Sequence, residues 1–138
     1  MTYIEEALVA YLKQTAALVD LIDARLFPLS WPQQDPTTGD SITFPAVTYM
    51  RLTGQDYHAF RAQPNLHKAT FQFQSWGIHY ADAKAVNQAL FEALNGFTGD
   101  MSGVSVQSIL SANREQDRRD PETQLFRVIS EYLIFYNI

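Results

Sequence analysis

The residues of this chain that could do chemistry are three histidines and a group of carboxylates between residues 113 and 123. The histidines are His58, His67 and His79. None of them has an acidic or histidine partner four residues away on a predicted helix, so the spacing of a helical zinc site is missing. We interpret the three histidines as surface or loop residues.

The carboxylates of residues 113–123 could be drawn as a metal site, because hard cations bind groups of carboxylate oxygens. Arginines are interleaved with them, however, and a segment in which opposite charges alternate is more typical of a solvated surface loop. The acids of such a site would be Asp117, Asp120 and Glu122, and the interleaved arginines are Arg114, Arg118 and Arg119. We therefore expect a self-compensating charged loop rather than a metal centre.

Other signatures of catalysis are missing from the sequence. The chain has no cysteine, so it has neither a thiolate nucleophile nor a disulfide framework. It contains no Gly-x-Ser-x-Gly elbow. Gly96 and Gly99 precede a predicted strand rather than a helix, which does not suit a phosphate-binding loop. The sequence predicts no reaction and no cofactor.

Length and composition predict one folded domain spanning residues 1–138. The apolar fraction of 46% is enough for a core, and there is no apolar run of membrane-spanning length. The N-terminus lacks the basic start and apolar run of a signal peptide, so export is not expected. A net charge of −5 argues against general binding to a phosphate backbone, which needs clustered Lys and Arg.

The clearest structural signal is a strand followed by a helix. Phe71 and Phe73 alternate with polar residues in 69–76, which predicts a strand with one buried face. Residues 80–95 then change to helical spacing, with an apolar stripe and a stop at Gly96. The stripe consists of Val86, Ala89, Leu90, Ala93, Leu94 and Phe97.

The N-terminal segment predicts a helix over residues 2–15. Thr2 and Glu5 have the spacing of a capping box, in which each end of the motif satisfies a backbone N–H of the other. Ile4, Leu8, Tyr11 and Leu12 follow as an amphipathic stripe. Residues 16–22 keep helical spacing and predict a second short helical turn.

Four more segments have the composition of strands: residues 25–28, 46–52, 104–112 and 125–138. Within 104–112 the apolar phase slips, since Ile109 falls on the opposite face from Val104 and Val106; a bulge or a twist would explain this. Residues 132–136 are apolar on both faces, which indicates either a central strand or a strand that pairs with another chain. The last two strands should form an antiparallel hairpin with a long charged tip.

The fold class is therefore α+β, with a mostly antiparallel sheet of about four to five strands and two helices packed on one face. Three long connections leave the frame, at residues 30–45, 54–66 and 113–123. Their aromatic and arginine residues are either satellite core residues or contacts to a partner, because interface hot spots favour these residue types. The candidate contact residues are Tyr57, Phe60, Arg61, Arg114, Arg118, Arg119 and Asp120.

Over most of its length the chain resembles the tail-terminator, or tail-completion, proteins of long-tailed phages and prophages. The resemblance rests on ordered short pieces of sequence, of which Gln72 to Trp76 before Tyr80-Ala-Asp-Ala-Lys84 is the most specific. The other pieces are residues 4–8 with Leu12, 25–28, 44–49 with Gly54, 94–97, 120–123 and 126–128.

The resemblance implies an α+β subunit that assembles as a ring, usually hexameric, at the head-proximal end of the tail tube. Such a ring stops tail polymerisation and provides the surface to which the head binds, without enzymatic activity or cofactor. The implied partners are further copies of the chain, the major tail tube protein and a head-completion or connector protein. DNA would pass through the ring lumen without specific recognition. The protein would be assembled in the bacterial host cytoplasm and reside in the virion.

Two alternatives remain open at the level of sequence. The first is another virion part, a neck or head-completion protein. The second is a small-molecule-binding or hydrolytic α+β domain, which would need a pocket with convergent polar groups.

Overall fold

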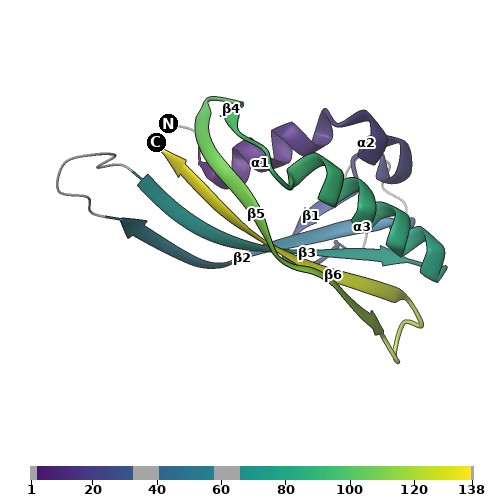
Figure 1. Ribbon diagram of the computed structural model, residues 1–138. Coiled ribbons are helices and arrows are strands. Elements are labelled where there is room, and N and C mark those ends of the chain that lie inside the picture. Colours follow the sequence, from purple (N-terminus) through teal and green to yellow (C-terminus); the bar gives the residue numbers. More distant parts are fainter. Residues whose placement is uncertain (1–2, 33–40, 58–65, 138) are drawn as a thin grey trace.

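The computed structural model describes residues 3–32, 41–57 and 66–137, with the backbone but not the side chains of residues 53–57 and 114 (Figure 1). The described chain begins with two helices, continues with three strands and a third helix, and ends with three strands. In order, the elements are α1 (Ile4–Lys13), α2 (Ala16–Ile22), β1 (Leu26–Pro28), β2 (Ala46–Tyr57), β3 (Leu66–Gly77), α3 (Tyr80–Leu94), β4 (Gly99–Met101), β5 (Val104–Arg119) and β6 (Phe126–Asn137).

The strands form one twisted sheet in the order β1-β2-β3-β6-β5-β4, and the three helices of the described chain lie over one face of it (Figure 1). All pairs are antiparallel except β1 with β2, which are parallel. The predicted fold class is confirmed in its α+β character. The described part has six strands and three helices, because the short segments β4 and α2 are regular elements.

The core lies between the helices and the sheet. Phe71 and Phe73 of β3 are 0% and 1% exposed, and Leu90 of α3 and Leu8 of α1 are buried above the sheet. Tyr11 fixes α1 to α3, since its hydroxyl donates to the carbonyl of Ala93 at 2.7 Å. Burial of such apolar area, at roughly 25 cal/mol per Å², is the main stabilising term.

Both predicted helical stripes are confirmed. In α3, Val86, Ala89, Leu90 and Leu94 of the predicted stripe are buried and Ala93 is partly buried against the core. Gly96 ends the helix with a left-handed φ of 81°. At the N-terminus, α1 begins at Ile4 rather than Thr2, and its N-cap is Tyr3 without a side-chain cap. Thr2 lies outside the described residues. The carboxylate of Glu5 pairs instead with Arg51 of β2, at 3.0 Å.

The sequence prediction placed the ends of several strands too early. β2 continues to Tyr57 and β5 continues to Arg119, so most of the segment expected as a charged loop is strand, and the hairpin tip is short. Charged side chains on an extended strand face solvent as easily as they do in a loop, so composition does not separate the two. β4 also forms within residues 97–103, where the sequence pattern predicted no strand.

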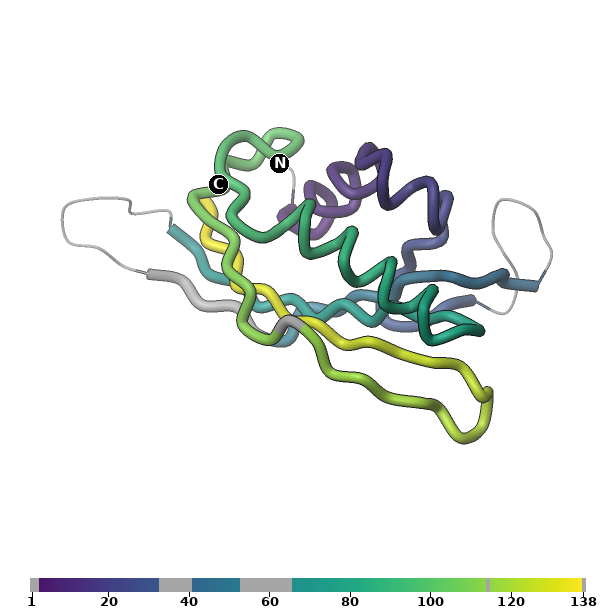
Figure 2. Tube along the Cα trace, turned by 45° about the vertical axis from the view of Figure 1, so that its right-hand side comes forward, coloured from purple at the N-terminus to yellow at the C-terminus, as the bar shows by residue number. Residues whose placement is uncertain are grey.

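The slip of apolar phase in β5 is a bulge, which is one of the two explanations that the sequence left open. The pairing of β5 with β6 shifts register between Val106 and Ser108, which returns Ile109 to the face of Val104 and Val106. All three are buried. Two further shifts follow between Ser111 and Gln116, and Figure 2 shows the hairpin of β5 and β6 extending beyond α3.

β6 is a central strand, which decides between the two interpretations of its apolar sequence. It bonds β3 on one side and β5 on the other along its length, so its backbone has no edge to offer another chain. Tyr132, Ile134 and Tyr136 are buried towards the helices, and the alternate residues Leu133 and Phe135 are half-buried on the opposite face.

Candidate protein-interaction site

The part of the β5–β6 hairpin near its tip is joined to α3 by a cluster of charged and aromatic side chains. Tyr80 and Lys84 lie one turn apart on α3 and therefore face the same side. Glu115 and Asp117 lie two residues apart on β5 and likewise face one side. The Tyr80 hydroxyl donates to Asp117 Oδ2 at 2.5 Å, and Lys84 Nζ lies 2.9 Å from Glu115 Oε2 and 3.1 Å from Asp117 Oδ1.

We call these four residues the hairpin clamp, because they connect a helix of the core to a strand that projects from it. The hydrogen bond from Tyr80, together with the ammonium of Lys84, lowers the pKa of Asp117 below its ordinary value. The hydrogen bond to Glu115, supported by Asp117, raises the pKa of Lys84. Both charges are thus stabilised by one another, which suits a structural role better than proton transfer at neutral pH.

Phe126 extends the clamp towards the hairpin tip. Its ring packs edge-on against Tyr80, with centroids 5.8 Å apart, and the guanidinium of Arg119 lies 5.2 Å from its centre. A shallow depression of about 250 Å³ opens here, lined by Tyr80, Asp117, Arg118, Arg119 and Phe126. Arginine beside aromatic rings is the composition that protein interfaces favour.

Three of the predicted contact residues meet at this end of the sheet. Arg118 and Arg119 are exposed at the end of β5, and Arg119 also bonds Gln124 Oε1 at 2.7 Å. Asp120 begins the turn, where its carboxylate accepts the backbone N–H of Glu122 at 2.9 Å; that hydrogen bond lowers the pKa of Asp120. Asp120 therefore shapes the turn, whereas the two arginines are available to a partner.

Of the other predicted contact residues, Tyr57 has its backbone away from the hairpin tip. Tyr57 is the last residue of β2, and its partner in the sheet is Leu66, at the end opposite to the hairpin. Its side chain lies outside the described residues, as do Phe60 and Arg61. Arg114 belongs to β5, but its side chain is likewise not described. Among the described positions, Tyr57 thus lies at one end of the sheet, and Arg118, Arg119 and Asp120 lie at the other.

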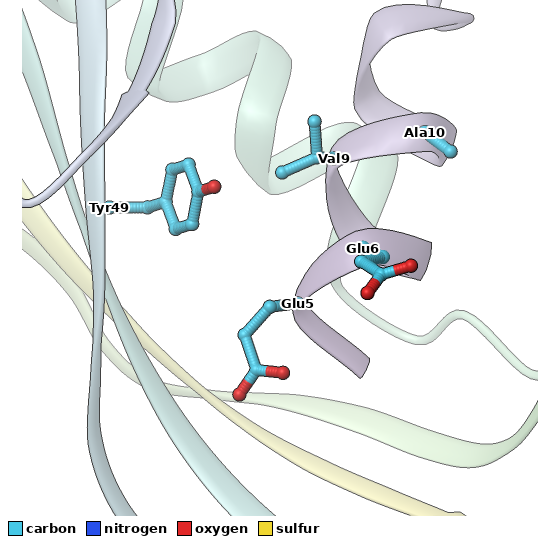
Figure 3. A pocket seen from close by; sticks show the side chains of 5 residues that line it. All are labelled: Glu5, Glu6, Val9, Ala10 and Tyr49. Atoms are coloured by element: carbon cyan, nitrogen blue, oxygen red, sulfur yellow. The ribbon is translucent and has the colours of Figure 1, made fainter. Parts of the chain in front are cut away.

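A second depression lies between α1 and β2. It measures about 340 Å³ and is lined by Glu5, Glu6, Val9, Ala10 and Tyr49. In Figure 3 the ring of Tyr49 projects from β2 towards α1, with Glu5 and Glu6 on the first turn of that helix. Burial, followed by the charge of Glu5, raises the pKa of Tyr49. These five residues give an apolar floor with an acidic rim and include no nucleophile–base pair.

The face of the sheet opposite the helices is covered at one end by an aromatic stack. Trp76 alternates along β3 with Ser75, which lies under the helices, so the indole faces away from them. Trp31 packs edge-on against it at 4.6 Å, and the Arg127 guanidinium lies 5.1 Å from its ring. The indole N–H donates to Thr48 Oγ1 at 2.9 Å. The ring contact between Trp31 and Trp76 anchors the segment before β2.

The described ranges contain no group of three His, Asp or Glu side chains placed to hold a metal ion. No helix in them is both long and apolar enough to cross a membrane. The acids considered as an alternative metal cluster point to different partners: Asp117 pairs with Lys84, whereas Asp120 accepts the backbone N–H of Glu122 in the turn.

Sequence reasoning missed Tyr80, Lys84, Glu115 and Phe126 as parts of the site. Each half of the hairpin clamp has a signal in the sequence. Tyr80 and Lys84 have helical i, i+4 spacing, and Glu115 and Asp117 have strand i, i+2 spacing. The second signal depends on knowing that β5 continues through the charged segment.

Comparison with known proteins gives one family and a set of similar structures. Residues 6–137 match the family model described as tail completion protein gp17. A chain in a solved structure titled "Virion of native gene transfer agent (GTA) particle" is similar with a TM-score of 0.71 and 18% identity, covering 100% of both chains. At that identity the likeness shows a shared fold. No curated protein sequence matches the chain.

Proposed function

The chain belongs to the tail completion protein gp17 family, and from this membership we propose that it caps the head-proximal end of a phage tail tube as a ring. The membership makes it a structural protein of the phage tail, located in the virion. We further propose that the ring, a hexamer, stops polymerisation of the tube and presents the surface to which the head binds. We propose as well that residues 1–138 act as one domain and that this domain has a structural role and no enzymatic one.

The observation that carries this proposal is the family match over residues 6–137, which spans both the core and the projecting hairpin. The shape of the subunit supports it. A ring needs a head-to-tail interface, in which two different patches of one subunit meet. The sheet has two dissimilar ends: the hairpin with Arg118 and Arg119 at one, and the end of β2 at the other. The partners proposed are a second copy, the tail tube protein and the head connector.

The experiment is deletion of the gene for this chain in the phage or prophage that encodes it, followed by electron microscopy of the particles. Without the protein, tails should have irregular, extended lengths and should not join heads. A plasmid copy should restore uniform, joined tails, whereas a copy carrying Leu90→Asp, which places a charge in the core, should not. Uniform tails that join heads in the deletion strain would refute the proposal.

A label on the protein distinguishes this function from that of another neck protein. An affinity tag with gold at the C-terminus should mark the junction between tube and neck on headless tails. A label found only on tail-less heads would instead assign the protein to the head side.

A further inference from the structure

β2 and β5, which we call the outer strands, lie beside the short edge strands β1 and β4 and are covered by them along only part of their length. β1 pairs with β2 only at Val47, Thr48 and Tyr49, although β2 continues to Tyr57. At the other edge, β4 pairs with β5 only from Val104 to Val106, although β5 continues to Arg119. Each outer strand thus has a covered half and a half that extends beyond its small neighbour.

Hydrogen bonds near the covered halves show which residues direct their backbone outwards. On β2 the N–H of Val47 donates to Arg25 at 2.9 Å, and the carbonyl of Tyr49 accepts from Leu29 at 2.8 Å. Successive residues of a strand direct their backbone N–H and C=O groups alternately to the two sides. The residues that alternate with Val47 and Tyr49 therefore bond β3. One bulge follows at Leu52, since the register shifts between Arg51 and Thr53.

Beyond that bulge the alternation places the backbone of Gly54 and Asp56 on the outer side of β2. On β5 the carbonyl of Ile109 accepts from Gly96 at 2.9 Å, and the N–H of Ser111 donates to Asn95 Oδ1 at 3.2 Å. The end of α3 thus covers the middle of this edge.

Beyond the last bulge of β5, pairing with β6 is regular from Gln116 to Arg119. Gln116 and Arg118 occupy the alternate positions that bond β6, which places the backbone of Asp117 and Arg119 on the outer side. Within the described residues no backbone hydrogen bond reaches Gly54 and Asp56, or Asp117 and Arg119, from that side. We call these pairs the β2 edge and the β5 edge.

We infer that the β2 edge of one copy pairs with the β5 edge of the next, so that the sheets of neighbouring subunits are continuous around the ring. This inference rests on the proposed ring and names the contact that closes it. The partner is a second copy of the chain, and the recognition is that of main-chain N–H and C=O groups, which an outer strand offers to another strand.

The directions of the strands suit this contact. β2 is antiparallel to β3, β3 to β6, and β6 to β5, so β2 and β5 run in opposite directions. When copies are placed head to tail with their helices on the same side, β2 of one copy is therefore antiparallel to β5 of its neighbour. That is the pairing in which hydrogen bonds are perpendicular to the strands. The two edges differ, as a head-to-tail interface requires.

The two edges lie at opposite ends of the sheet, and Figure 1 shows these ends projecting on either side of the helices. Arg118, at the centre of the β5 edge, is level through Arg127 with Trp76 of β3. Gln55, at the centre of the β2 edge, pairs with Lys68, which lies eight residues from Trp76 along β3. At 3.3 Å per residue the neighbour is displaced by about 26 Å along the strands. A closed ring accommodates such a displacement when its strands are inclined to the ring axis, as in closed barrels.

The absence of native cysteine makes disulfide cross-linking a direct test. Four double variants combine Thr53→Cys or Gln55→Cys with Gln116→Cys or Arg118→Cys, so that neighbouring registers are sampled. Each is expressed in the deletion strain, and its tails are purified, oxidised and run on a non-reducing gel. At least one pair should give a ladder of cross-linked species that ends at the ring. The matched control joins Thr53→Cys to Ser105→Cys, an exposed position of β5 that β4 covers, and should remain monomeric.

The single-cysteine variants distinguish other geometries. If the same edge paired with itself, Gln55→Cys or Gln116→Cys alone would give a dimer, and the inference would be overturned. It would also be overturned if rings formed on the tails while none of the four double variants cross-linked. Failure of the proposed function has a different signature, because the deletion strain would then produce uniform, joined tails.

A backbone variant tests the same contact without a cross-link. Asp56→Pro removes an N–H that faces outwards, so it leaves the bonds of β2 to β3 in place, and proline is tolerated on outer strands. The variant should melt as a folded protein but should fail to restore uniform tails, whereas Asp56→Asn, which keeps the N–H, should restore them. Full restoration by a folded Asp56→Pro would refute the pairing.

Discussion

Removing the ammonium of the hairpin clamp should measurably destabilise the protein. Lys84 lies 2.9 Å from Glu115 and 3.1 Å from Asp117, and the three side chains are 28%, 36% and 45% exposed. Ion pairs of this exposure contribute about 0.5 kcal/mol each, because water and salt screen them. Lys84→Met keeps most of the apolar stem, so we expect the free energy of unfolding to fall by about 1 kcal/mol. For a chain of this size the melting temperature should fall by about 4 °C.

The pH dependence of this loss follows from the two pKa shifts. Asp117 has its pKa lowered in the folded state, so its contribution is present above the ordinary value of 3.8 and is lost as the pH falls through the folded value. Lys84 has its pKa raised, so its contribution is present below 10.5 and is lost only as the pH rises through its folded value. The difference between wild type and variant should therefore be constant from about pH 5 to 9 and should shrink below pH 4.

Urea unfolding followed by circular dichroism gives the free energies, at 0.05 M and 1 M NaCl. The difference should fall by half or more at the higher salt, where the screening length is about 3 Å. Lys13→Met, which removes an exposed lysine at the end of α1, is the matched control and should change stability by less than about 0.5 kcal/mol. A Lys84→Met protein as stable as wild type, or a loss that does not depend on salt, would show that the clamp does not hold the hairpin.

Three further substitutions test the core and the junctions. Leu90→Ala should lower the free energy of unfolding by about 2–5 kcal/mol, because the side chain is fully buried and its removal leaves a cavity. Calorimetry or urea unfolding measures this loss, and a smaller loss would contradict the central position of Leu90 in the core. Ser130→Ala should raise the melting temperature slightly, since within the described chain its buried hydroxyl has no hydrogen-bond partner; a lower melting temperature would reveal one. Gly77→Ala should destabilise by about 1–3 kcal/mol, because an added Cβ would lie 2.9 Å from the backbone N of Ala83, and a neutral result would mean that α3 can shift.

Much of the fold could be predicted from local pattern. The alternation of Phe71 and Phe73, and the helical spacing from Val86 to Leu94, each report which face is buried, and burial of one face is what forms the strand and the helix. The slip in apolar phase at Ile109 predicted the bulge for the same reason, since the side chain must return to the core. The family resemblance, carried by ordered short pieces of sequence, is confirmed by the match over residues 6–137.

The length of the outer strands could not be predicted in this way. Residues 113–119 are polar on both sides, so no buried face marks them as strand, and their extended conformation comes from pairing with β6. For the same reason the clamp was not foreseen: Tyr80 and Asp117 are 37 residues apart, and the hairpin register decides that they meet.

The sequence by itself determined the local elements, the α+β class and the family of this protein, because these depend on periodicities and short pieces read along the chain. The tertiary structure decided the order of the strands, and with it that β6 is central while β2 and β5 are the long outer strands. Strand order is a non-local property: an apolar run such as residues 132–136 suits a central strand and an intermolecular one equally well. Only the pairing of the whole sheet shows which backbone groups remain for another subunit.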